Sequence, residues 1–195
     1  MPRLCLAILS VLGAVSLAET ASTEPVKDWK IEDFDAVLFV ALEGYRDFEN
    51  GERTFAKASC LDCHRFAGKG PAASAAPDLT AIGKRESPRD LLEAVLHPEK
   101  SLAPGFAPRK IGLIDGRTLQ GLVRDETGSG LTLVRDPRKV EEGIRIRKDG
   151  IVADEPAALS LMPEGLLDAF DEEDVLDLLA YLLAGGNPED AMFRH

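Results

Sequence analysis

Between Asp47 and Ser59 the apolar positions recur at helical spacing. Phe48, Gly51 and Phe55 are three and four residues apart, so they fall on one face of a predicted helix. Glycine is a poor helix former, and its place on this face indicates that another helix crosses closely there.

Two further stretches predict helices with clear start signals. Ser87-Pro88-Arg89-Asp90 combines a capping residue, a proline suited to the first helical position and an acid three residues after the cap. This helix is predicted to end near His97, before Pro98. The last helix is predicted to begin at the acidic run 171–174 and to stop at Gly185-Gly186, because acids complement the positive end of a helix and glycine ends it.

The middle of the chain has a strand-like pattern. Asp115-Gly116 is a hairpin signal, and the predicted strands are Lys110–Ile114, Thr118–Val123, Leu131–Val134 and Ile144–Arg147. We therefore expect a small antiparallel β insertion over residues about 109–154. The predicted fold class is mainly α, with this insertion between the middle helices and the segment that contains Met162.

The N-terminus has the pattern of a secretory signal peptide over residues 1–18. A basic start is followed by an apolar run from Leu4 to Leu17 and by the small residue Ala18. The run is short for a membrane span, so we expect cleavage after Ala18 and no membrane span in the mature chain. An uncleaved anchor is the alternative. Residues 19–45 are predicted to form a linker and a short helix.

The charge balance narrows the class of partner. The chain carries 34 acidic and 23 Lys or Arg side chains, which gives a formal net charge of −11. A surface of this sign argues against nucleic acid. It favours a soluble protein whose partner has a basic docking patch.

Residues 60–64, with the sequence C-L-D-C-H, carry the most specific chemistry. C-x-x-C-H is the attachment signature of a c-type haem. Two thiols three positions apart can each form a thioether to the ring, and the adjacent histidine can ligate iron. We therefore expect one covalent haem c, with thioethers at Cys60 and Cys63 and His64 as the proximal iron ligand.

Two other kinds of site use a C-x-x-C pair, namely zinc sites and redox dithiols. Zinc needs two more ligands, yet the chain after the predicted signal peptide offers no further cysteine, only His97 and His195. A redox dithiol of the thioredoxin kind would sit near a βαβ pattern, which this sequence lacks. Export also suits the haem interpretation, because c-type haem is attached outside the cytoplasmic membrane in bacteria.

The second axial position has four candidates, Met162, His97, Met192 and His195. Met162 precedes a proline in an apolar segment, which suits an axial thioether, but from chemistry alone a methionine that fills a core gap is as good an interpretation. Its separation of 98 positions from His64 is long for a small haem domain, and the predicted insertion accounts for about half of it. His97, at a helix end, is predicted to cap carbonyl groups, and Met192 and His195 lie in a polar tail.

These motifs occur in an order that resembles the class I cytochrome c superfamily. The residues are Gly51-x-x-x-Phe55, Cys60-x-x-Cys63-His64, Pro77-Asp78-Leu79-Thr80, Met162-Pro163 and the run 177–182. More narrowly, the chain is similar to the Pirellula/Verrucomicrobium-type haem-binding domain, through residues 46–51, 91–93, 115–117 and 160–167. The resemblance covers residues 46–190 and leaves 191–195 as a tail.

The resemblance implies a cytochrome c-like helical haem domain with Met162 as the distal iron ligand. It also implies that the carbonyl of Pro77 accepts a hydrogen bond from the second ring nitrogen of His64, and that Gly51 and Phe55 meet Tyr181 where the first and last helices cross. The chain departs from the family at residues 75–76, which are two alanines where a glycine usually precedes the proline.

The expected function is that of an exported, periplasmic monohaem electron carrier rather than an enzyme. Its expected partner is a redox protein, such as a periplasmic dehydrogenase or oxidase. The alternatives are a haem enzyme or a gas or redox sensor with an open distal site, and a haem module that docks a periplasmic dehydrogenase through the β insertion.

Overall fold

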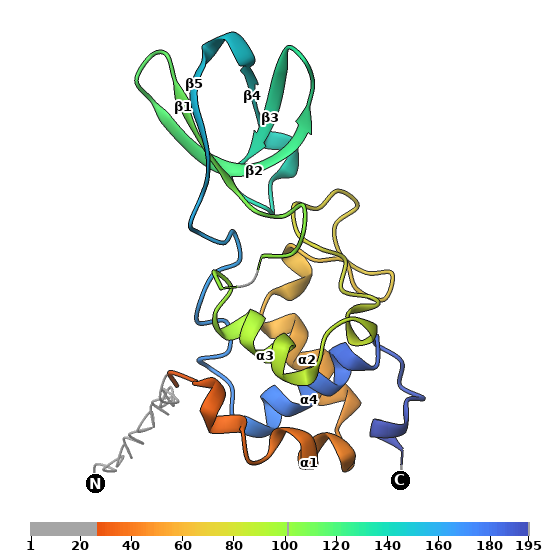
Figure 1. The fold of residues 1–195 in the computed structure, drawn as a ribbon. Coiled ribbons are helices and arrows are strands. Elements are labelled where there is room, and N and C mark those ends of the chain that lie inside the picture. The colour runs from red at the N-terminus through yellow and green to blue at the C-terminus, as the bar shows by residue number, and fades with distance from the viewer. Residues whose placement is uncertain (1–26, 101, 195) are drawn as a thin grey trace, which may run out of the picture.

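A computed structural model describes residues 27–100 and 102–194 of the chain. Its α-helices are α1 (Leu38–Glu43), α2 (Phe48–Lys57), α3 (Pro88–Leu96) and α4 (Glu172–Leu183). Its strands are β1 (Arg109–Leu113), β2 (Thr118–Glu126), β3 (Gly130–Val134), β4 (Ile144–Arg147) and β5 (Ile151–Pro156). The helices gather at one end of the molecule and the strands at the other (Figure 1).

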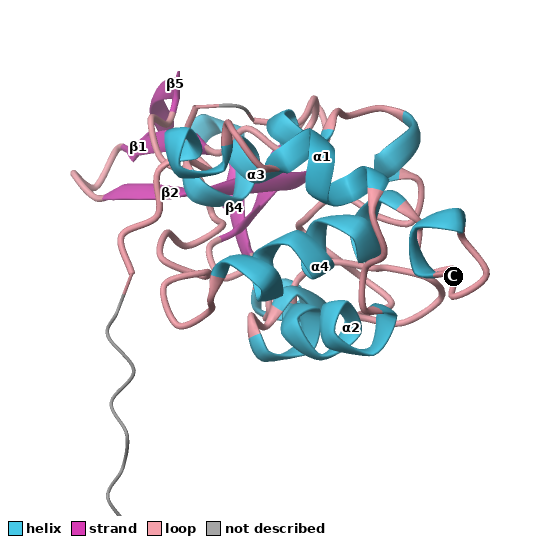
Figure 2. Ribbon diagram, turned by 90° about the horizontal axis from the view of Figure 1, so that it is seen from below, coloured by secondary structure: helices cyan, strands magenta, loops and turns pink. Residues whose placement is uncertain are grey.

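Helices α2 and α4 cross at a glycine. A Cβ atom at Gly51 would collide with the backbone carbonyl of Asp177 and would lie 2.8 Å from Cβ of Tyr181. Any side chain at this position would push the two helices apart, and the views from the front and from below both place them side by side (Figure 2). The predicted close crossing at Gly51 is therefore confirmed.

Aromatic rings fill the crossing between the two helices. Tyr181 of α4 has Phe48, Phe55 and Phe66 around it, with ring centroids at 5.2, 5.7 and 5.1 Å. Such tilted and edge-on pairs add to the free energy of apolar burial. Phe193 packs on Phe48 at 5.2 Å, which joins the C-terminal segment to the same core.

The segment before α2 also belongs to this core. Residues 31–43, predicted as a short helix, form the 3-10 turn η1 (Ile31–Phe34) and α1. Phe34 and Leu38 are fully buried, and the indole of Trp29 donates a hydrogen bond to the carbonyl of Phe170 at 3.2 Å. This N-terminal segment closes the core beside α4.

The predicted helix starts are confirmed by their caps. The side chains of Asp47, Ser87 and Asp171 each accept a hydrogen bond from the backbone N–H three residues later, at 3.0, 3.2 and 2.9 Å. Each cap satisfies an N–H group that the first turn of a helix leaves without a partner.

The strands form one antiparallel sheet in the order β4-β3-β2-β1-β5. Its inner face has an apolar cluster of its own, made by Ile111, Leu113, Leu131, Leu133 and Ile146. The four predicted strands are all present. The pattern missed β5, because five of its six residues are exposed and no apolar alternation marks it.

Strand β2 bends in the middle and serves two partners. Its first half pairs with β1, up to Arg109↔Gly121, and its second half pairs with β3, from Leu122↔Val134 onward. At the bend Gly121 lies against the Val134 carbonyl, whose carbon would be 2.9 Å from a Cβ atom. The lack of a side chain allows β2 to fold over, so that Leu122 and Val134 face the helical part of the chain.

The expectation of a mainly α fold is wrong. Helices hold 34% of the described residues and the five-stranded sheet holds 19%. The error arose because the insertion was treated as an addition to a helical domain. It has five strands and its own buried cluster, while loops replace helix over much of the remaining chain.

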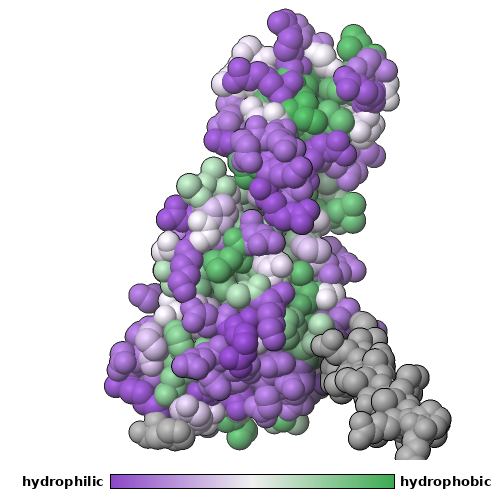
Figure 3. All heavy atoms as spheres, turned by 180° about the vertical axis from the view of Figure 1, so that it is seen from behind, coloured by the Kyte–Doolittle hydropathy of each residue, from purple (hydrophilic) through white to green (hydrophobic). Residues whose placement is uncertain are grey.

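No helix in the described ranges is both long enough and apolar enough to cross a membrane. The predicted signal peptide at 1–18 lies outside the described residues. Seen from behind, the surface is mostly hydrophilic, with smaller hydrophobic areas in the sheet and in the part of the molecule below it (Figure 3).

Candidate haem site

The C-x-x-C-H motif follows directly on α2. Ser59 reverses the chain with a φ of 59°, and the 3-10 turn η2 (Cys60–Asp62) comes next. The backbone N–H of His64 then donates to the carbonyl of Cys60 at 2.9 Å. This tight turn holds the two thiols and the imidazole in one short segment.

Both thiols are free, half-buried and protonated at neutral pH. Burial raises the pKa of Cys60 to about 12. Burial also raises the pKa of Cys63, and the neighbouring carboxylate of Asp62 adds to the shift. A redox dithiol needs a thiol with a lowered pKa, so this environment disfavours that alternative.

His64 is oriented by a backbone carbonyl. Its Nδ1 lies 2.8 Å from the carbonyl oxygen of Pro77. Because a carbonyl only accepts, Nδ1 carries the proton, and Nε2 keeps a lone pair that can bind a metal. Burial lowers the pKa of His64, an effect that the bond to Pro77 opposes. The neutral ring is the form that ligates iron.

Ser74 ties the loop that carries Pro77 to the motif. Its hydroxyl donates to the carbonyl of Cys63 and accepts the N–H of Ala76 at 2.9 Å. Further on, the N–H of Leu79 donates to the carbonyl of Arg65 at 2.9 Å. Sequence reasoning missed Ser74. The available signal was the serine itself, because a serine hydroxyl in a turn often accepts the backbone N–H two residues later.

Met162 lies in the loop between β5 and α4. It is half-buried, and its backbone N–H donates to the hydroxyl of Ser160 at 3.1 Å. Together with Pro98, Glu99 and Leu159 it lines a cavity of about 240 Å³. The thioether thus borders open space rather than filling the core.

The sheet joins the loop of Pro77 to the segment of Met162. Leu122 and Val134 from the sheet form a buried cluster with Ala75, two residues before Pro77, and Leu161, next to Met162, packs against the same cluster. The apolar base of the sheet therefore contacts both segments. Nothing in the sequence pattern indicated this contact.

The insertion also brings charge to the motif. The guanidinium of Arg138 lowers the pKa of Cys63 and the carboxylate of Asp136 raises it, as secondary effects beside burial and Asp62. These two residues pair with each other at 3.0 Å. The segment after β3 is consequently a neighbour of the cysteine that follows η2.

The remaining candidates for the second axial position lie elsewhere. His97 is the C-cap residue of α3, and its backbone N–H donates to the carbonyl of Glu93 at 2.8 Å. Met192 belongs to the 3-10 turn η6 (Ala191–Phe193), where its carbonyl accepts the N–H of Arg46 at 2.8 Å. That is the opposite end of α2 from the motif. His195 lies outside the described residues.

The zinc alternative gains no support from the geometry. Within the part of the chain that the structure describes, no group of three or more His, Cys, Asp or Glu side chains is placed to hold a metal ion. The donor set at residues 60–64 is two thiols and one imidazole, which fits a haem with two thioether bonds and one axial histidine.

Comparison with known proteins agrees with this donor set. Residues 48–116 match the family model of cytochrome c, a stretch that includes α2, the C-x-x-C-H motif, α3 and β1. No curated protein matches the chain. The match ends before Met162 and α4. It supports a haem-binding electron carrier with haem c as cofactor, rather than an enzyme. Residues 48–116 are therefore similar to a cytochrome c domain, which is consistent with the class I cytochromes that the motifs resemble.

Proposed function

We propose that this protein is an exported monohaem c-type cytochrome that transfers single electrons, with His64 and Met162 as axial ligands. The observation that carries the proposal is the bond from His64 Nδ1 to the Pro77 carbonyl at 2.8 Å. It leaves Nε2 free beside two half-buried cysteines that are not in a disulfide. The haem would supply a reversible one-electron change at its iron.

Each protein group then has a distinct task. Cys60 and Cys63 hold the ring through thioether bonds. His64 binds the iron, and the Pro77 carbonyl fixes the imidazole and raises its basicity. Cys60 also packs against the helical core together with Leu61 and other partly buried apolar side chains, so the surroundings of the ring have low polarity on this side.

Met162 is proposed as the distal ligand on two grounds. It is half-buried and lines a cavity, so it is not locked in the core. Its neighbour Leu161 shares an apolar cluster with Ala75 from the loop of Pro77, so the segments on the two sides of the proposed ring are packed on a common base. Methionine with histidine raises the reduction potential above that of two histidines.

We further propose that the protein is exported by its N-terminal segment and meets a redox protein, such as a periplasmic dehydrogenase or oxidase. The predicted signal peptide supports export. The net charge of −11 favours a partner with a basic patch, because opposite charges speed the encounter of two proteins.

The test compares Met162→Ala with Met192→Ala in the holoprotein. Met162→Ala is expected to remove the methionine-to-iron charge-transfer band of the ferric spectrum and to lower the reduction potential. Met192→Ala, at the other end of α2, is expected to leave both unchanged. A Met162→Ala spectrum identical to that of the parent protein would exclude Met162 as ligand.

Carbon monoxide distinguishes the carrier from a haem enzyme or gas sensor. The ferrous parent protein is expected to resist carbon monoxide, because both axial positions are filled by protein groups. Met162→Ala is expected to bind it readily. Rapid binding by the parent protein at neutral pH, without a methionine-to-iron band, would contradict the proposed ligation and favour an open distal site.

A further inference from the structure

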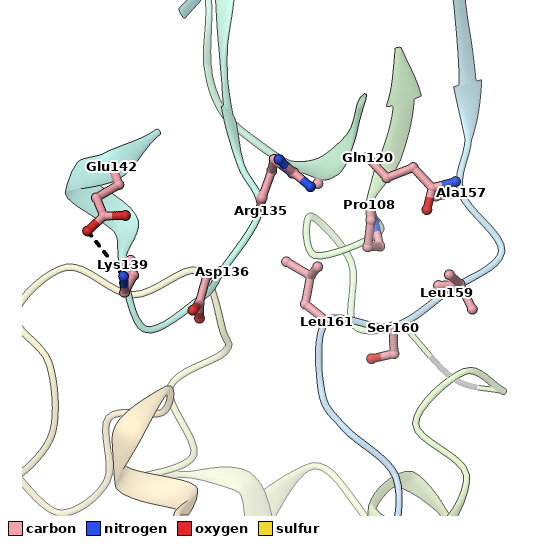
Figure 4. Close-up of a pocket in the computed structure, with 11 residues that line it drawn as sticks. Pro108, Gln120, Arg135, Asp136, Lys139, Glu142, Ala157, Leu159, Ser160 and Leu161 are labelled. Atoms are coloured by element: carbon pink, nitrogen blue, oxygen red, sulfur yellow. Dashed lines mark ion pairs between the residues drawn. The ribbon is translucent and has the colours of Figure 1, made fainter. Parts of the chain in front are cut away.

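A second and larger cavity lies where the sheet meets the rest of the chain. Its volume is about 500 Å³, within the range of small-molecule sites. The bend of β2 and the segment that follows β3 form one side of it, and the segment 157–161 that leads toward Met162 forms another (Figure 4). None of the residues assigned to the haem lines this cavity.

One charge in this cavity is uncompensated. Lys139 pairs with Glu142 at 3.4 Å, and Asp136 pairs with Arg138, so these lining charges are balanced. The guanidinium of Arg135 has no hydrogen-bond or ion-pair partner among the described residues. Figure 4 shows it next to the end of β3, above Leu161 and on the side of the cavity that faces Gln120.

An unpaired arginine is unusual in this sheet. The described residues 109–156 contain seven arginines, and five of them form ion pairs with carboxylates, at positions 109, 117, 124, 138 and 147. Only Arg135 and Arg145 in that range lack one. Arg145 lies on the edge strand β4 and does not line the cavity. Of these two arginines, only the solvent-exposed Arg135 presents its unpaired guanidinium to the open cavity.

The other lining groups complete a site for a small anion. Gln120 offers an amide whose side chain has no partner in the described part of the chain, and the hydroxyl of Ser160 lies on the opposite wall. Pro108 and Leu161 supply apolar surface. A planar guanidinium matches the two oxygens of a carboxylate or a phosphate. We propose that this cavity binds a small organic anion of the carboxylate or phosphate class, whose acidic group pairs with Arg135.

The occupant lies close to the proposed distal ligand. Ser160 accepts the backbone N–H of Met162 at 3.1 Å, and Leu159 and Ser160 line both this cavity and the smaller one beside Met162. An anion that contacts Ser160 is thus one hydrogen bond from the Met162 backbone. The binding site itself depends on Arg135 and not on the axial ligation.

The test is calorimetric titration of the holoprotein with inorganic phosphate and, separately, with citrate. We expect saturable binding of one equivalent of at least one probe. Arg135→Gln is expected to weaken it about tenfold to a hundredfold, as for loss of a hydrogen bond to a charged group. The matched control is Arg145→Gln, which removes the other unpaired arginine and is expected to leave the affinity unchanged.

The outcomes of this titration can be told apart from those of the Met162→Ala test of axial ligation. Binding of citrate with little binding of phosphate assigns the carboxylate class, and the reverse assigns the phosphate class. If neither probe saturates, or if Arg145→Gln weakens binding as much as Arg135→Gln does, the proposal is overturned. Met162→Ala is expected to keep anion binding even though its spectrum changes, so failure of one proposal leaves the other open to its own test.

Discussion

His64 and Pro77 are held together by one hydrogen bond, from ring Nδ1 to the backbone carbonyl oxygen at 2.8 Å. Thirteen positions separate them in the chain, and Ser74 anchors the intervening loop to the carbonyl of Cys63. The orientation of the imidazole is therefore a property of the folded loop. A cofactor would meet a ligand that is already aimed, with its tautomer set.

Replacement of Ser74 by alanine tests this loop. The change removes the tie between Cys63 and the loop, so the Pro77 carbonyl is expected to bond His64 less tightly. A less basic imidazole stabilises ferric iron less, and the reduction potential is expected to rise. Potentiometric titration measures the shift. Ser129→Ala, in an exposed turn of the sheet, is the control, and an equal shift in both variants would argue against a role for the loop.

Gly51→Ala tests the crossing of α2 and α4. The new methyl group would collide with the Asp177 carbonyl, and overpacking of a tight contact costs about 1–3 kcal/mol or more. The gain in helix propensity, about 1 kcal/mol, is too small to offset a forced separation of two helices. Urea denaturation is expected to show a lower free energy of unfolding. Gly128→Ala, with nothing within 4 Å of the added carbon, should be close to neutral.

Asp177 is expected to matter far more for stability than its neighbour Glu173. Asp177 is buried and accepts hydrogen bonds from the Asp47 N–H at 3.0 Å and the Asn50 amide at 2.9 Å, beside the guanidinium of Arg46 at 3.5 Å. Asp177→Ala leaves all three donors without this acceptor, at a cost of about 3–5 kcal/mol.

Glu173 pairs with the same Arg46 at 2.8 Å but is 67% exposed, so Glu173→Ala is expected to cost at most about 1 kcal/mol. Asp177→Asn keeps one acceptor oxygen and should recover part of the loss. Thermal unfolding of the three variants gives the order. Equal melting temperatures for Asp177→Ala and Glu173→Ala would show that the buried network contributes little.

Substitutions at two buried leucines of the sheet distinguish the stability of the sheet from its contact with the segments of Pro77 and Met162. Leu122 belongs to the cluster that contains Ala75 and receives Leu161, whereas Leu131 belongs to the inner cluster of the sheet. Both are buried, and truncation of either to alanine is expected to cost about 2–5 kcal/mol. Only Leu122→Ala is expected to weaken the methionine-to-iron band of the folded ferric protein. A spectrum that changes equally in both variants would contradict a specific contact.

Local signals in the sequence were sufficient for much of the fold and for one side of the site. The caps at Ser87 and Asp171 and the glycine at the helix crossing follow short-range rules, and the structure agrees with each. The hairpin at residues 115–116 was found for the same reason. His64 and the two cysteines are adjacent in sequence, so their chemistry could be recognised without a fold.

What the sequence did not indicate depends on contacts between distant segments. Strand β5 is mostly exposed and owes its place to pairing with β1, so no local periodicity marks it. Two features exist only when the sheet packs against the segments that contain Ala75 and Leu161. They are the contact of Ala75 with Leu122 and the cavity that Arg135 lines. The role of Met162 stays a prediction because the cytochrome c match ends at residue 116.

The two ends of the sheet meet, since the N–H of Ala157 donates to the carbonyl of Pro108 at 2.9 Å. This contact shortens the effective length of chain between the segments on either side of the sheet. His64 and Met162 are 98 positions apart, but 49 of those positions lie between Pro108 and Ala157. Once the sheet has formed, the loop to be closed between the two segments is about half as long, which lowers the cost of closure by about 0.6 kcal/mol. An insertion that nearly doubles the distance in sequence thus adds little to the search by which the two segments find each other.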